Sequence, residues 1–327
     1  MARPLLRHGA HTEAGRRPSN QDAVTVESFP DGRVLLALAD GMGGHRAGEQ
    51  ASACALAKLV EELRAGASLE DAFRAANRAV YDAAQENPEW EGMGTTLIGL
   101  LVEDGGYQIA NVGDSRAYHV VKRTVTRLTA DHSVLEEARR TGPEAVREVE
   151  GTRWRHALTR AVGTEPEVEV DRFGPFPVEE AHTVLLCSDG LYQVVSEEAL
   201  AEDLETSAAD LDASARGLVE RAFENGSTDN ISVVLGAFDP AGVPVSSRVE
   251  GSTDSGPRAR NSETPRAAVT TPASAETVAA PLLGFDDSAR SRRRGRRSRL
   301  RSWLRQYDTA LAVAIFMVVS GLLLWFL

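Results

Sequence analysis

Apolar runs of strand length alternate with longer helical patterns over roughly the first 240 residues. The runs RVLLALAD, GTTLIGLLVE, YQIANVGD, TVLLCSDG and ISVVLGAF are bounded by Gly, Asp and Ser, which is typical of β-strands. Residues 45–66 and 68–88 carry apolar side chains at the spacing of an amphipathic helix. Ser68 and Asp71 are suited to begin the second of these helices.

The order of these elements favours antiparallel strand pairing over simple βαβ winding. The two helices follow one another without a strand between them, and the runs ending at Glu103 and beginning at Tyr107 are joined by the turn sequence Glu-Asp-Gly-Gly. Residues 131–156 are polar with weak periodicity, and we expect a flap of short helices there. Residues 1–239 are therefore predicted to form one domain of the α+β class.

The composition changes after Asp239. Residues 240–289 hold six prolines and many Ser, Thr, Ala and Gly residues, which predicts a disordered linker. Residues 290–308 form a basic segment, with nine arginines and no acidic residue within 290–305. Residues 309–327 are uncharged, and as a helix they would extend about 28 Å, close to the thickness of a bilayer core. A buried core helix is the alternative, but no further chain follows to cover it.

The positive segment places the predicted membrane helix in a definite orientation. Positive flanks stay on the cytoplasmic side, so a single-pass protein of the cell membrane with residues 1–239 in the cytoplasm is expected. The net charge of −12 combines +6 from residue 241 onward with −18 before it, which is unlike a nucleic-acid-binding domain. The arginines of 290–305 could bind nucleic acid, but their position beside the predicted span favours anionic lipid.

Four aspartates lie at the ends of apolar runs. Asp40, Asp114 and Asp189 each end such a run, and Asp229 precedes one. Each alone is best explained as part of an ordinary turn, but four can converge on one opening, where repulsion and burial would raise their pKa values. Divalent cations remove that penalty, and ligands that are all oxygen suit Mg²⁺ or Mn²⁺. Cys54 and Cys187 lie in apolar runs and are expected to be buried, reduced thiols.

The sequence around these aspartates resembles the metal-dependent type 2C (PPM) protein phosphatases, and within them the bacterial branch, over about residues 8–238. The segments that carry the resemblance occur in the family's order: RxxNQDA (Arg17, Asn20, Gln21, Asp22), ALADGMGGHRAGEQAS (37–52), EGMGTT (91–96), NVGDSRAY (111–118), TADHS (129–133), LTRAVG (158–163), LLCSDGL (185–191) and STDNISVVL (227–235).

The resemblance implies a fold, a reaction and a set of roles. The implied fold is an α-β-β-α sandwich of two antiparallel sheets flanked by helices, and the reaction is hydrolysis of phosphoserine and phosphothreonine in proteins by a metal-activated water. Two Mn²⁺ or Mg²⁺ ions are implied, with a possible weaker third. The implied metal ligands are Asp40, the Gly41 carbonyl, Asp189 and Asp229, with Asp114 for the third ion. Arg17 would bind the phosphate and Asp22 would orient the water.

Departures from the family pattern and rival functions remain open at this point. Many relatives have Glu where Gln21 stands, and Met42 occupies the position of a His proposed as general acid in eukaryotic members. For His45 and His132 we expect structural roles rather than catalysis. The rival functions are a pseudophosphatase that binds without turnover and a regulator of one phosphoprotein in a sigma-factor pathway. The tail better fits a general partner of a membrane Ser/Thr kinase.

Overall fold

The computed structural model describes residues 5–43, 47–206 and 210–240. All described residues belong to one compact unit, within residues 1–250. His45, the linker of 240–289 beyond its first residue, the basic segment and the predicted membrane helix lie outside the described residues. None of the helices within the described ranges has the length and hydrophobicity of a membrane span.

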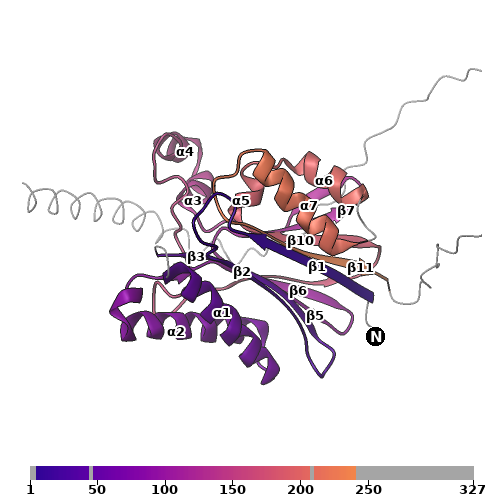
Figure 1. The fold of residues 1–327 in the computed structure, drawn as a ribbon, viewed down its shortest axis with the longest axis horizontal. Coiled ribbons are helices and arrows are strands. Elements are labelled where there is room, and N and C mark those ends of the chain that lie inside the picture. Colours follow the sequence, from indigo (N-terminus) through magenta and orange to yellow (C-terminus); the bar gives the residue numbers. More distant parts are fainter. Residues whose placement is uncertain (1–4, 44–46, 207–209, 241–327) are drawn as a thin grey trace, which may run out of the picture. The chain divides into compact units, whose positions relative to one another are not determined.

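Two antiparallel sheets form the centre of the described unit (Figure 1). One sheet has the strand order β1-β11-β10-β7-β8, and the other has the order β2-β3-β5-β6-β9 with the short β4 paired to β3. The strands are β1 (Leu5–Glu13), β2 (Asp22–Ser28), β3 (Val34–Met42), β4 (Gly94–Thr95), β5 (Leu97–Glu103), β6 (Gly106–Val112), β7 (Arg116–Val121), β8 (Thr124–Arg127), β9 (Asp171–Pro177), β10 (His182–Cys187) and β11 (Ile231–Asp239).

Helices cover the outer face of each sheet. The elements α1 and α2 pack on the sheet that contains β3 and β5, and α5, α6 and α7 pack on the sheet that contains β10 and β11. The helices are α1 (Ala47–Arg64), α2 (Leu69–Glu86), α3 (Val134–Thr141), α4 (Pro143–Glu150), α5 (Asp189–Tyr192), α6 (Glu197–Thr206) and α7 (Leu211–Glu224), with one 3-10 turn η1 (Pro88–Trp90).

The sequence of β3 shows why the layers form. Successive side chains of a strand point to opposite faces of the sheet. Leu35, Ala37 and Ala39 therefore pack under α1 and α2, while Leu36 and Leu38 pack between the sheets against residues of β10 and β11. Both faces of β3 are buried, which explains why it reads as a continuous apolar run rather than an alternating one.

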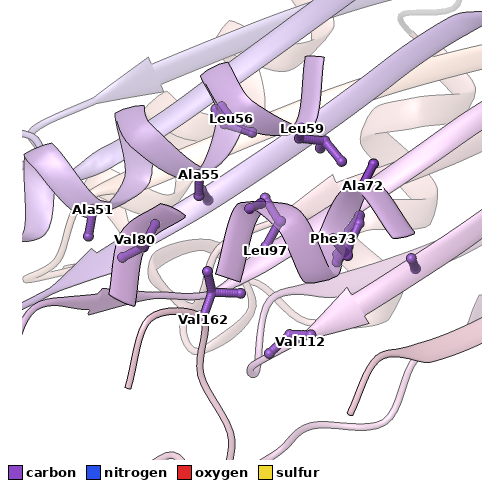
Figure 2. Packing of buried hydrophobic residues seen from close by; sticks show 14 of the residues in the cluster. Ala51, Ala55, Leu56, Leu59, Ala72, Phe73, Val80, Leu97, Val112 and Val162 are labelled. Atoms are coloured by element: carbon purple, nitrogen blue, oxygen red, sulfur yellow. The ribbon is translucent and has the colours of Figure 1, made fainter. Parts of the chain in front are cut away.

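The α1–α2 layer closes over its sheet through small and large side chains in contact (Figure 2). Ala51 and Ala55 of α1 have no exposed surface, which lets this helix lie close to the strands. Phe73 of α2 is also fully buried and points toward the sheet, close to Gly99 of β5. Ser68 caps α2 by accepting a hydrogen bond from the Asp71 amide over 3.2 Å, as the sequence predicts.

Several expectations from the sequence are confirmed and one is wrong. The strand pairs are antiparallel, and Glu103 faces Gly106 across the predicted hairpin. Residues 134–150 form the two short helices expected in the flap. Cys187 is buried and free, but Cys54 is only half-buried because it lies on the flank of α1 rather than on its sheet-facing side.

Two glycines provide a test of the packing of β1 against α7. A Cβ on Gly9 would lie 2.3 Å from the Leu211 carbonyl carbon, so no side chain fits there. Gly217 lies in α7, the helix that Gly9 of β1 contacts, and a Cβ on Gly217 would meet nothing within 4 Å. We expect Gly9→Ala to lower the free energy of unfolding by about 1–3 kcal/mol through overpacking.

Gly217→Ala serves as the matched control. It should raise the free energy of unfolding by up to about 1 kcal/mol, because alanine is the better helix former. Urea unfolding of both variants measures the difference. Equal effects of the two substitutions would contradict the close contact between β1 and α7.

Candidate functional site

Two aspartates from neighbouring strands meet at one end of the sandwich. Asp22 begins β2 and pairs directly with Asp40 in the register of β2 and β3. The two carboxyl groups influence each other, because the pKa of Asp40 is raised by burial and then by the charge of Asp22. Asp40 lies inside β3 rather than after it, because the strand continues through Met42 to pair with β4.

Two further aspartates reach the same end from the other sheet. The paired strands β10 and β11 are followed by Asp189 and preceded by Asp229, respectively. A Cβ on Gly190 would lie 2.0 Å from the Asn230 carbonyl oxygen, so only glycine allows the two chain segments to approach this closely. This contact brings Asp189 and Asp229 together.

The charges of these carboxyl groups act on one another. Burial raises the pKa of Asp40 well above its ordinary value, and the charges of Asp22, Asp189, Asp114 and Asp229 raise it further. Burial, followed by the charges of Asp114, Asp229 and Asp22, raises the pKa of Asp189 to about 8. The four aspartates that the sequence predicts to converge therefore form one electrostatic cluster, which also includes Asp22.

Asp22 is the most enclosed member of the cluster. Its Oδ2 accepts hydrogen bonds from the hydroxyls of Ser232, over 2.6 Å, and Ser188, over 2.9 Å. Its Oδ1 is buried and has no donor. Burial raises the pKa of Asp22 to about 6 even though the serine hydrogen bonds lower it. One oxygen is fixed and the other remains available within the cluster.

Arg17 lies at the rim of the cluster. Its Nε donates to the Thr228 carbonyl over 3.0 Å and its Nη2 contacts Asp229 Oδ2 over 2.8 Å. About half of the Arg17 side chain is exposed. The planar fork of arginine matches the oxygens of a phosphate. Its position agrees with the phosphate-binding role that the resemblance implies.

Asp114 is held by a network that the sequence did not reveal. The Tyr192 hydroxyl lowers the pKa of Asp114, and the Arg116 guanidinium lies 3.5 Å from the centre of the Tyr192 ring. Arg116 is itself held by two hydrogen bonds to Asp131, of 3.1 and 2.8 Å. Burial and then the charge of Asp131 raise the pKa of Asp114 to about 6.

Two other residues position the loops of the site. Asn230 donates to the carbonyls of Ala14 and Ser19 and accepts from the Gln21 amide, which fixes the loop that carries Arg17. His132 Nδ1 accepts from the Gly113 amide, next to Asp114. The structural role expected for His132 agrees with this contact. Asn230 was missed because its partners are some 210 residues away in the chain.

The cluster has the chemistry of a site for hard divalent cations. Its donors are oxygens, its ionisation is opposed by crowding, and Asp22 keeps a buried oxygen without a donor. Within the described residues no three His, Cys, Asp or Glu side chains are already arranged as a complete metal site. The oxygen donors of the cluster are nevertheless of the type that such ions prefer. Gly41 follows Asp40 directly, with its carbonyl oxygen close to Gly48 of α1.

Comparison with known proteins identifies the family. The model of the family described as Protein phosphatase 2C matches residues 10–225. The chain belongs to the protein phosphatase 2C family. Every member of the carboxylate cluster except Asp229 lies within the matched range, and Asp229 follows it closely.

Named relatives agree with this assignment. The chain is 36% identical over 235 residues to the serine/threonine phosphatase stp of Listeria welshimeri, which covers 68% of this chain and 92% of the relative. It is 36% identical over 241 residues to the serine/threonine protein phosphatase PstP of Mycobacterium tuberculosis, covering 71% of this chain and 45% of that protein. The phosphatase 2C chain is therefore a protein serine/threonine phosphatase.

A solved structure shows the same fold. The serine/threonine phosphatase Stp1 from Staphylococcus aureus superimposes with a TM-score of 0.66 at 32% identity, over 72% of this chain and 96% of that one. The sandwich of two antiparallel sheets flanked by helices is thus the phosphatase 2C fold, in a family that depends on metal ions.

The raised pKa values of the cluster predict how stability depends on pH in this phosphatase. The pKa of Asp189 is raised to about 8, so between pH 6.5 and 8.5 the folded protein releases a proton that the unfolded chain has already lost. The raised pKa of Asp40 acts in the same direction. Stability must then fall as pH rises. In EDTA we expect the free energy of unfolding to drop by about 1–2 kcal/mol across this range, a value reduced for partial solvent exposure.

Urea unfolding at several pH values measures this slope. Saturating Mn²⁺ should remove it, because the cations neutralise the same carboxylates, and Asp189→Asn in EDTA should flatten it. Stability that is constant or rises with pH in EDTA would contradict the crowding of these groups.

Proposed function

We propose that the carboxylate cluster holds two Mn²⁺ or Mg²⁺ ions, with a weaker third ion at Asp114. Asp40, the Gly41 carbonyl, Asp189 and Asp229 are the proposed ligands of the first two. When bound, these ions supply acidification of the attacking water and neutralisation of phosphoryl charge. The observation that carries the proposal is the convergence of four carboxylates around Asp40. Their charges, together with burial, oppose ionisation of Asp40 and raise its pKa.

The surrounding residues supply binding and orientation. Arg17 would bind the phosphate through its guanidinium, while the Thr228 carbonyl and Asp229 hold its Nε and Nη2. Asp22 would orient the water through Oδ1, since its Oδ2 is occupied by Ser188 and Ser232. No side chain has to form a covalent bond to phosphorus in this scheme.

The residues of this cluster favour turnover over the rival functions. A pseudophosphatase, which binds without hydrolysis, has no need for five crowded carboxylates whose ionisation costs stability. A regulator of a single phosphoprotein in a sigma-factor pathway would be distinguished by its substrate range rather than by this site.

The proposed setting is the cytoplasmic face of the cell membrane. The apolar segment 309–327 would anchor the chain, and the arginines of 290–305 would bind anionic lipid on the cytoplasmic side. A membrane Ser/Thr kinase would then share phosphorylated substrates with this phosphatase. These parts of the proposal rest on sequence, since both segments lie outside the described residues.

Asp40→Asn tests the metal site. We expect a loss of at least about 100-fold in kcat with Mn²⁺, because the central carboxylate loses its charge. Asp229→Asn should show a similar loss. Asp31→Asn, the same change in the exposed turn before β3, is the control and should keep the rate.

Turnover of p-nitrophenyl phosphate and of a phosphothreonine peptide measures these effects, and circular dichroism verifies the fold. Near wild-type rates in both Asp40→Asn and Asp229→Asn would contradict the proposed metal site. A wild-type protein without turnover on either substrate would support the pseudophosphatase.

Removal of residues 306–327 tests the anchor. The truncated protein should move to the soluble fraction and keep its rate on p-nitrophenyl phosphate, since the site lies wholly within residues 17–229. Fractionation of cells that express either form measures the change. A truncated protein that stays with the membrane would contradict anchoring by this segment.

A further inference from the structure

An arginine stacks on an exposed aromatic ring next to the proposed phosphate site. Phe223, near the end of α7, is one of two large apolar side chains that are exposed among the described residues, at 41%. The guanidinium carbon of Arg16 lies 5.1 Å from the centre of its ring, and Arg16 Nη2 contacts the Phe223 carbonyl at 3.4 Å. The ring and the carbonyl both favour this orientation of Arg16.

Arg16 differs from Arg17 in what neutralises it. The Arg17 guanidinium contacts Asp229, whereas Arg16 has no carboxylate partner within the described ranges. Its side chain is exposed. Stacking satisfies one face of a guanidinium and leaves donors at its edge, so Arg16 keeps both its charge and its capacity to bind an anion.

The position of Arg16 matches the neighbours of a target phosphate. Arg16 and Arg17 are consecutive, so their Cα atoms are about 3.8 Å apart. An extended peptide advances about 3.3 Å per residue, and with two long arginine side chains the reach covers one to three residues from the phosphorylated one. Phe223 and Thr228 contact Arg16 and Arg17, respectively, so both arginines rest on the same stretch of chain.

The negative charge of residues 1–240 increases the effect that one exposed arginine has on the binding of acidic peptides. Residues 1–240 carry a net charge of −18, which disfavours acidic substrates over most of the surface. A fixed arginine beside the phosphate site offsets this repulsion at one place only. It would therefore discriminate between phosphopeptides according to the charge near their phosphorylated residue.

We propose that Arg16, held on Phe223, is a specificity-determining residue that binds a carboxylate or a second phosphate one to three residues from the phosphoserine or phosphothreonine. This inference rests on the proposed role of Arg17 as the phosphate-binding residue. It selects among phosphoprotein substrates by their acidic flanks. Arg16 does not take part in hydrolysis, and its contribution lies in binding.

Matched phosphothreonine peptides test the proposal on the full-length protein in mild detergent with Mn²⁺. Three peptides of equal length carry Glu residues before the phosphothreonine, Glu residues after it, or Gln at all those positions. For wild type we expect kcat/KM to be about threefold to fivefold higher for one acidic peptide than for the Gln peptide, through KM. A second phosphate in place of Glu should increase this preference.

Three variants separate specificity from structure. Arg16→Ala should reduce the preference to about 1, and Arg16→Lys should retain part of it, since charge remains without the stacked fork. Arg78→Ala is the matched control, because Arg78 is also exposed and lies over an aromatic ring, that of Tyr81. It should keep the wild-type preference.

Phe223→Ala tests whether the ring orients Arg16. It should reduce the preference partly, and in Arg16→Ala/Phe223→Ala the preference should be no lower than in Arg16→Ala alone, because both changes remove one interaction. An Arg16→Ala variant that retains the wild-type preference, or loses the same factor on all three peptides, would overturn the proposal. Failure of the proposed function is distinct, because wild type would then hydrolyse none of the peptides.

Discussion

The mutual repulsion of five carboxylates at one end of the sandwich is the constraint on which the rest of the site depends. Asp22 and Asp40 come from one sheet, and Asp189 and Asp229 come from the segments that flank paired strands of the other. Burial and like charge both oppose their ionisation. Such an arrangement persists only because the two packed sheets fix the strands that carry it, and it gains stability when cations bind.

The supporting residues keep this cluster in place at several levels. Ser188 and Ser232 lie on adjacent segments, bond to one another through backbone and hydroxyl groups, and both donate to Asp22. Asn230 ties the loop of Arg17 to the start of β11. The site is thus assembled where three distant parts of the chain meet. The phosphate binding proposed for Arg17 and the selectivity proposed for Arg16 would both depend on this loop.

Much of the fold could be predicted from the sequence, because strands such as β3 and β10 are buried on both faces and read as continuous apolar runs. Strands β1, β2, β7, β8 and β9 were not predicted, since polar residues or proline interrupt their apolar pattern and pairing with a neighbour decides their conformation. The four aspartates Asp40, Asp114, Asp189 and Asp229 were found because each ends or precedes an apolar run in the sequence, although Asp40 lies within β3 in the structure. The roles of Tyr192 and Asn230 depend on contacts across the fold, which no local pattern contains.

Crystals of the phosphatase grown with Mn²⁺ test the central claim most directly. Anomalous scattering would locate the ions independently of activity. The account predicts strong peaks bound by Asp40, Asp189 and Asp229, with a weaker one at Asp114 that weakens further as Mn²⁺ is lowered. Crystals that bind Mn²⁺ only elsewhere, while the five carboxylates remain without it, would contradict the account.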